Sequence, residues 1–132
     1  MLKITYTDAG LVLERVAQTV ESVVAQRTVL ALRLGGSIAV QPTYASLPLP
    51  SDLAGIAELH HLARKTGAIG IDGCDRNWLE VTLHGTWISE SSSSDEGIFV
   101  AELEAALESL LLSLWQQAQR QFIASRRVHR AC

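Results

Sequence analysis

The chain has 132 residues, of which 48% are hydrophobic and 19% are charged, and its net charge is −3. This size fits one compact domain, and apolar residues along the whole length exclude a mostly disordered chain. The acidic balance predicts that nucleic acid is not a partner, unless the short basic tail at residues 125–132 alone makes contact, because phosphate backbones are normally met by clustered Lys and Arg. No apolar run approaches the roughly 20 residues of a membrane helix, and none at the start has signal-peptide length. We therefore expect a soluble cytoplasmic protein without membrane contact.

The opening residues predict a hairpin followed by one short helix. Apolar and polar residues alternate over residues 2–7, turn residues follow, and residues 11–13 are apolar, which is typical of two paired strands. The stretch 16–27 fits both a helix face and strand alternation. We favour a short helix there.

Residues 30–40 carry the best hairpin signal in the chain. Leucines alternate over residues 30–34, a Gly-Gly pair follows, and the alternation resumes over residues 38–40. Three prolines lie between residues 42 and 50 and remove backbone donors, so this stretch is predicted to be a crossing or edge segment.

The middle of the chain predicts one helix and two strands. Ser51 is a good N-cap, and apolar residues recur at helical spacing over residues 53–63, up to Gly67. Residues 69–71 begin an extended piece, and residues 79–83 alternate as a strand.

The last part predicts a loop, a strand and a long helix. Gly85 fits a β-bulge, and the Ser-rich stretch 89–96, which cannot bury a core, is predicted to be a mobile loop. Residues 98–100 fit a short strand. A wide apolar stripe over residues 103–122, acidic at its start and basic at its end, predicts a C-terminal helix.

This order of elements predicts an α+β fold, in which an antiparallel sheet built from hairpins carries two main helices packed on one face. We expect a single domain over residues 1–124, followed by a basic C-terminal tail at residues 125–132.

The densest polar cluster is a Gly-bearing turn between two extended segments. It contains Asp72, Cys74, Asp75 and Arg76, and His84 lies on the polar side of the strand that follows. Functional groups often lie on such turns, so these five residues form a candidate ligand site. Asp and Gly are also the residues that any tight turn selects.

The two cysteines give no further chemistry. Cys74 and Cys132 stand far apart, with no partner cysteines at metal-ligand spacing. The sequence therefore predicts no metal site, no cofactor and no disulfide framework, and it identifies no catalytic residue.

Large apolar side chains indicate a contact surface. Parity along the strand places Trp87 in the core and Trp78 on the opposite, exposed face, and Leu112 and Trp115 widen the apolar sector of the last helix. Excess apolar surface points to dimerisation or to a partner, and a second core layer explains it about as well. We expect Trp78, Leu112 and Trp115 to form an interaction surface.

Three stretches resemble small uncharacterised proteins of cyanobacteria: LKITYTDAG at residues 2–10, VTLHGTWI at residues 81–88 and EGIFV at residues 96–100. The resemblance carries over no catalytic or binding residue. It implies a cytosolic protein of a photosynthetic bacterium, where many such proteins help to assemble or regulate larger complexes. In size, acidity and element mix the chain is also similar to small acidic secretion chaperones. Those are α+β homodimers, but they open with a helix where this chain opens with a hairpin.

Two functional hypotheses follow. The first is a non-catalytic protein-interaction or assembly factor, homodimeric, that holds a protein partner through an apolar patch. The alternative is a small-molecule-binding protein or small enzyme that uses the 72–76 turn with a nearby histidine. Because no catalytic groups converge in the sequence, we favour the first.

Overall fold

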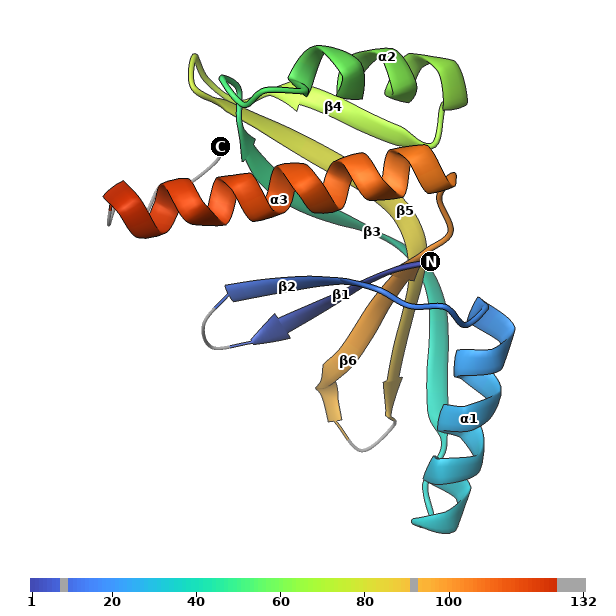
Figure 1. The fold of residues 1–132 in the computed structure, drawn as a ribbon. Coiled ribbons are helices and arrows are strands. Elements are labelled where there is room, and N and C mark those ends of the chain that lie inside the picture. The colour runs from blue at the N-terminus through green and yellow to red at the C-terminus, as the bar shows by residue number, and fades with distance from the viewer. Residues whose placement is uncertain (8–9, 91–92, 126–132) are drawn as a thin grey trace. The chain divides into compact units, whose positions relative to one another are not determined.

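The computed structural model describes the backbone of residues 1–7, 10–90 and 93–125, and their side chains except at 90, 93–96 and 122–125. These described residues form a six-stranded antiparallel sheet and three helices, which confirms the α+β fold (Figure 1). The elements in chain order are β1 (Leu2–Thr7), β2 (Gly10–Arg15), α1 (Val20–Arg33), β3 (Ile38–Pro50), α2 (Ile56–Thr66), β4 (Ile69–Gly73), β5 (Trp78–Glu90), β6 (Ser93–Ala101) and α3 (Ala105–Ser125). The sequence predicted two main helices, but α1, with 14 residues, is longer than α2, with 11.

The chain divides into two compact units, each made of two segments. The first unit contains residues 1–44 and 84–103, and the second contains residues 45–83 and 104–132. The strand order is β2-β1-β6-β5-β3, with β4 paired to β5 off this path, and both β3 and β5 contribute residues to each unit. The single domain over residues 1–124 stays a prediction. The predicted basic tail lies outside the described residues, apart from Ser125 at the end of α3.

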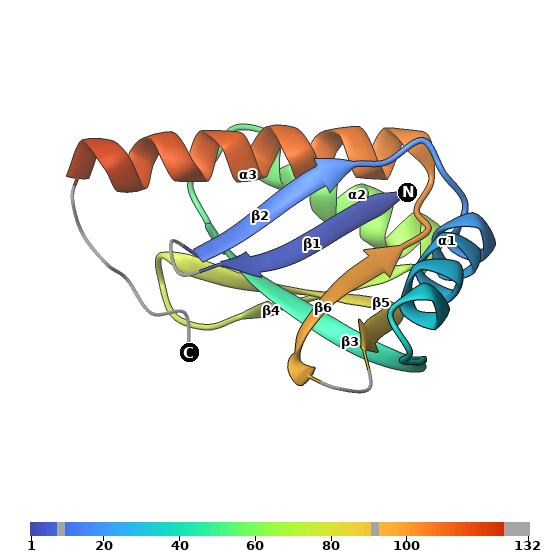
Figure 2. The same ribbon diagram turned by 90° about the horizontal axis from the view of Figure 1, so that it is seen from below.

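The first unit is built on the opening hairpin, which the structure confirms. β1 pairs with β2 along its whole length, with Leu2 opposite Arg15, and it pairs with β6, with Ile4 opposite Phe99. Figure 2 shows β2, β1 and β6 side by side in this unit. Leu2 and Ile4 are fully buried, as the alternation of residues along a strand predicts.

Helix α1 packs on this part of the sheet. It begins after Thr19, whose side-chain oxygen accepts a hydrogen bond from the Ser22 N–H at 3.2 Å. Its inner face contributes to a buried hydrophobic cluster with β5 and β6. The members of the cluster are Val23, Ile88, Ile98 and Val100. The favoured helix is therefore present, although it begins later and runs further than residues 16–27.

The hairpin predicted over residues 30–40 is wrong, because the Gly-Gly pair ends a helix instead of turning a strand. The Gly35 N–H donates to Leu32 O at 3.1 Å, and the Gly36 N–H donates to Ala31 O at 2.8 Å. These two bonds form a Schellman motif, in which Gly35 takes the left-handed conformation with φ +78°. The leucines before it continue the helical hydrogen bonds of α1.

On the other face of β5 and β6, two glycines make room for two aromatic rings. A Cβ added to Gly85 would lie 2.5 Å from Phe99 Cζ, and one added to Gly97 would lie 2.6 Å from Trp87 Cζ2. Phe99 and Trp87 are themselves opposite each other in the strand register. Each ring therefore lies across a glycine of the neighbouring strand.

The loop predicted over residues 89–96 is mostly strand in the structure, and its predicted mobility stays a prediction. β5 extends to Glu90 and β6 begins at Ser93, these two residues are paired, and residues 91–92 lie outside the described residues. A polar stretch buries no core, but its backbone groups can still pair across a hairpin. The register is irregular between Ser89 and Glu90, and the bulge predicted at Gly85 stays a prediction.

In the second unit, α2 starts later than predicted. The Ser51 hydroxyl donates to Arg76 O at 3.0 Å and does not cap the helix. The helix begins at Ile56 after Gly55, which has φ +98° and makes no side-chain capping bond. Its end agrees with the prediction, because Gly67 has φ +65°.

Helix α3 confirms the predicted C-terminal helix. It contacts α2 closely at Gly55, where an added Cβ would lie 3.4 Å from Leu110 Cδ1 and 3.5 Å from Leu114 Cδ2. Its buried hydrophobic residues are Leu107, Leu111, Leu114, Trp115 and Ala118. In the described part of the chain, no helix combines the length and apolar character needed to cross a membrane.

Candidate functional site

The turn at residues 72–76 is shaped by its own hydrogen bonds. Asp75 Oδ1 accepts a hydrogen bond from the Asn77 N–H at 2.7 Å. The Cys74 N–H donates to Trp78 O at 3.0 Å and closes the hairpin between β4 and β5. The Asp75 carboxylate therefore has a structural role as an Asx turn.

Two of the other side chains of this turn are exposed to water, and one is half-buried. Asp72 and Arg76 are exposed, and Cys74 is half-buried with its Sγ 3.8 Å from Glu80 Oε2. Cys74 is disulfide-bonded. The sequence predicted no disulfide, because the spacing of cysteines along the chain does not show which sulfur atoms lie close together in the fold. A disulfide sulfur is not a thiolate nucleophile. The ligand site at this turn stays a prediction.

His84 lies in the first unit and contacts an aromatic ring there. The ring centroids of His84 and Tyr44 are 4.4 Å apart with an interplanar angle of 58°. Both side chains are exposed. The aromatic contact accounts for the position of the imidazole, and its role in a ligand site stays a prediction.

Two of the three residues predicted to form an interaction surface are buried, and the interaction itself stays a prediction. Trp78 and Trp115 are only 5% and 7% exposed, and Leu112 is half-buried. Trp87, predicted to be in the core, is half-buried, and its ring centroid is 6.5 Å from that of Tyr6. Strand parity shows which face a side chain points to, but it does not show whether that face is covered.

Exposed apolar side chains gather instead at the end of α1. Four residues, three in its last turns and one at its C-cap, form this surface, here named the apolar end of α1. They are Val29, Leu30, Leu32 and Leu34, which are 49%, 53%, 65% and 75% exposed. Arg33 is the one polar residue among residues 29–34. A helix that is apolar on all sides is typically buried, so this segment is unusual at a surface.

Sequence reasoning missed the apolar end of α1 because it assigned residues 30–34 to a strand, in which alternate leucines face a core. In the helix, Leu30 and Leu34 follow Val23 by seven and eleven residues and lie on the same side of α1, but there they are exposed. The Thr19 cap and the glycine pair after Leu34 were the signals that indicate one helix over this whole stretch.

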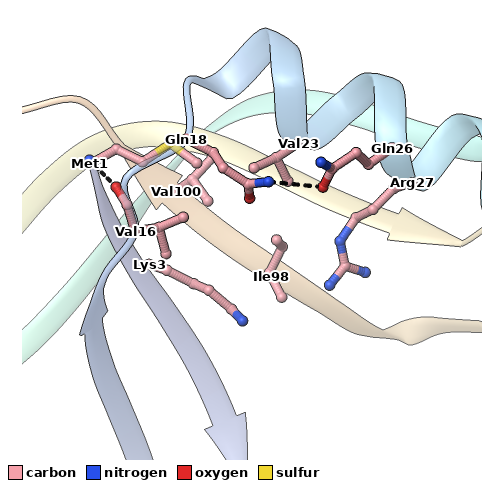
Figure 3. A pocket seen from close by; sticks show the side chains of 9 residues that line it. All are labelled: Met1, Lys3, Val16, Gln18, Val23, Gln26, Arg27, Ile98 and Val100. Atoms are coloured by element: carbon pink, nitrogen blue, oxygen red, sulfur yellow. Dashed lines mark hydrogen bonds between the residues drawn. The ribbon is translucent and has the colours of Figure 1, made fainter.

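A cavity of about 150 Å³ lies between α1, β1 and β6 in the first unit (Figure 3). Its apolar lining residues are Met1, Val16, Val23, Ile98 and Val100. Its polar lining residues are Lys3, Gln18, Gln26 and Arg27. Sequence reasoning did not find this cavity, because its lining comes from four separate segments of the chain.

Two hydrogen bonds hold the rim of the cavity together. Gln18 Nε2 donates to Gln26 Oε1 at 3.0 Å, and the amino group of Met1 donates to Val16 O at 2.7 Å. The first ties the segment before α1 to the helix, and the second ties that segment to the start of β1. Figure 3 shows both bonds.

Within the residues that the structure describes, no group of three or more His, Cys, Asp or Glu side chains is placed to hold a metal ion.

Comparison with known proteins identifies a family. Neither a search of curated proteins nor a search of solved structures gave a match. The family model described as Alr0857-like, after a locus name of the cyanobacterium Anabaena, matches residues 1–119. The chain therefore belongs to the Alr0857-like family, which confirms the resemblance to small cyanobacterial proteins.

Proposed function

We propose that this protein is a non-catalytic factor that binds another protein through the apolar end of α1. The observation that carries the proposal is the exposure of four large apolar side chains within six consecutive residues. Contiguous apolar surface of this kind marks interaction sites on soluble proteins.

The hydrophobic effect supplies the driving force for such docking. Complete burial of a Val or Leu side chain contributes about 1.5–3 kcal/mol. Leu32 and Leu34 keep 65% and 75% of their surface in water, so a partner that covers them gains most of this contribution. The fold itself gains little from these two leucines, because they remain largely exposed.

The protein bound at the apolar end of α1 is either a different protein or a second copy of this chain. A two-fold dimer would place the same patch of each copy in contact. We therefore include self-association in the test, as one form of protein binding.

The test compares the wild-type protein with the double variant Leu32→Ser/Leu34→Ser. Tagged protein is used to capture partners from an extract of the source organism, and purified protein is sedimented over a range of concentrations. We expect the wild type to retain a partner or to self-associate, and the double variant to lose at least about 90% of that binding. Circular dichroism checks that the variant stays folded.

The matched control is Val12→Ser, which removes an apolar side chain that is 38% exposed on β2 of the same unit. We expect this control to bind like the wild type. Equal binding by the double variant would contradict the proposal. So would a wild-type protein that captures nothing and stays monomeric at every concentration.

A further inference from the structure

Among the residues that the structure describes, the lining of the cavity between α1, β1 and β6 has two cations and no acid. We propose that it binds a small organic carboxylate, whose oxygens lie at Lys3 and Arg27 and whose apolar body lies against Val23, Ile98 and Val100. This site is separate from the apolar end of α1, and the inference does not rest on the docking function proposed above.

The two cations extend into the site from opposite walls. Lys3 comes from β1 and Arg27 from α1, both are half-buried, and Figure 3 shows their charged groups on either side of Ile98. Neither is paired with a carboxylate within the described part of the chain. Exposed Glu14 lies opposite Lys3 in the β1–β2 register. The residues three and four positions from Arg27 along α1 are all apolar: Val23, Val24, Leu30 and Ala31.

The rim of the cavity also favours a negatively charged ligand. The bond from Gln18 uses the side-chain oxygen of Gln26 as acceptor, so the NH₂ group of Gln26 remains a donor for an anion. Residues on both sides of the first turn of α1 line the cavity, and the positive end of a helix dipole favours negative charge nearby. Arg and Lys form charge-assisted hydrogen bonds to carboxylate oxygens, and these are among the stronger hydrogen bonds in proteins.

The apolar wall and the volume of the cavity determine which carbon chain the carboxylate ligand can carry. Val23, Ile98 and Val100 are buried and present only hydrocarbon. A cavity of about 150 Å³ can hold a molecule the size of benzene, about six heavy atoms. Inorganic phosphate would meet the cations but would leave these side chains without apolar contacts. A carboxylate with a short branched carbon chain satisfies both parts of the lining.

The test is an NMR titration of the full chain with isovalerate in buffer of low ionic strength, followed through backbone amide shifts. We expect saturable shifts centred on Val23, Gln26 and Ile98. Isovaleramide has the same shape without the charge, so we expect its affinity to be at least about tenfold lower than that of isovalerate. Inorganic phosphate, which lacks the apolar body, should also bind more weakly than isovalerate.

The variants Lys3→Gln and Arg27→Gln each remove one cation, and each should weaken isovalerate binding about tenfold. The control is Arg33→Gln, which removes an exposed arginine of α1 outside the cavity lining and should bind isovalerate like the wild type. Absence of saturable shifts would overturn the proposal. Equal binding of isovaleramide, tighter binding of phosphate, or full affinity in Arg27→Gln would overturn it as well.

Discussion

At the scale of single residues, Gly85 and Gly97 are necessary because of the rings that cover them. A Cβ at Gly85 would collide with Val100 O as well as with Phe99, and one at Gly97 would lie 2.6 Å from Ile88 O. Backbone atoms cannot rotate away, so any side chain at these positions has to displace a strand. Glycine costs conformational entropy in a strand, and the packed aromatic rings offset that cost.

We predict that Gly85→Ala and Gly97→Ala each lower the free energy of unfolding by about 1–3 kcal/mol, because overpacking forces backbone shifts. Urea unfolding measures this change. The control is Gly70→Ala on β4, where an added Cβ meets only Thr82 Cβ at 3.9 Å. A Gly97→Ala protein with the same unfolding midpoint as Gly70→Ala would show that the rings do not need the glycines.

At the scale of elements, the end of α1 depends on Gly35. This residue holds φ +78°, and an added Cβ would meet nothing within 4 Å, so a substitution there costs only backbone conformation. We predict that Gly35→Ala lowers the free energy of unfolding by about 1–2 kcal/mol, which is the cost of the left-handed conformation for an L-residue.

Gly36 provides the matched control for that prediction. Its φ is not in the left-handed region, and an added Cβ would lie 3.7 Å from Ala31 O, an ordinary contact. Gly36→Ala should change the free energy of unfolding by less than about 0.5 kcal/mol in the same urea experiment. Equal losses for the two variants would mean that the Schellman motif does not hold the helix end.

The elements that could be predicted from the sequence have apolar residues that fit only one period, either helical or strand, and that face a core on one side. The opening hairpin and α3 are of this kind, because Leu2 and Ile4 alternate into a core and the α3 stripe buries Leu107, Leu111 and Leu114. Residues 30–34 fit both the helical and the strand period, and because Leu30, Leu32 and Leu34 are exposed, burial in a core does not decide between them. For the site, patterns along one segment identified the 72–76 turn, but no pattern along a single segment brings Lys3 and Arg27 together.

At the scale of the whole molecule, neither compact unit is continuous in sequence. In the first unit, Val23 of α1 packs against Ile98 and Val100, which follow it by more than 70 residues. The helix therefore gains its packing only after β5 and β6 have formed. Such long-range pairing is typical of domains that fold slowly.

We predict that a fragment of residues 1–44 loses the helical structure of α1. A helix of 14 residues is marginal in water without tertiary packing, and this fragment lacks the β5 and β6 members of the buried cluster. Circular dichroism at 222 nm, compared with the full chain, measures the loss. A fragment that keeps a native-like helical signal would show that α1 is stable without the sheet.

The prolines of β3 affect how the protein associates with other molecules. β3 stands at the end of the strand order, and Pro42, Pro48 and Pro50 interrupt its row of N–H donors. An additional strand cannot form an unbroken hydrogen-bond ladder along such an edge. Growth into fibrils by edge-to-edge strand addition is therefore blocked on this side of the sheet. The chain can therefore carry an exposed apolar helix end without also presenting an unbroken strand edge along β3.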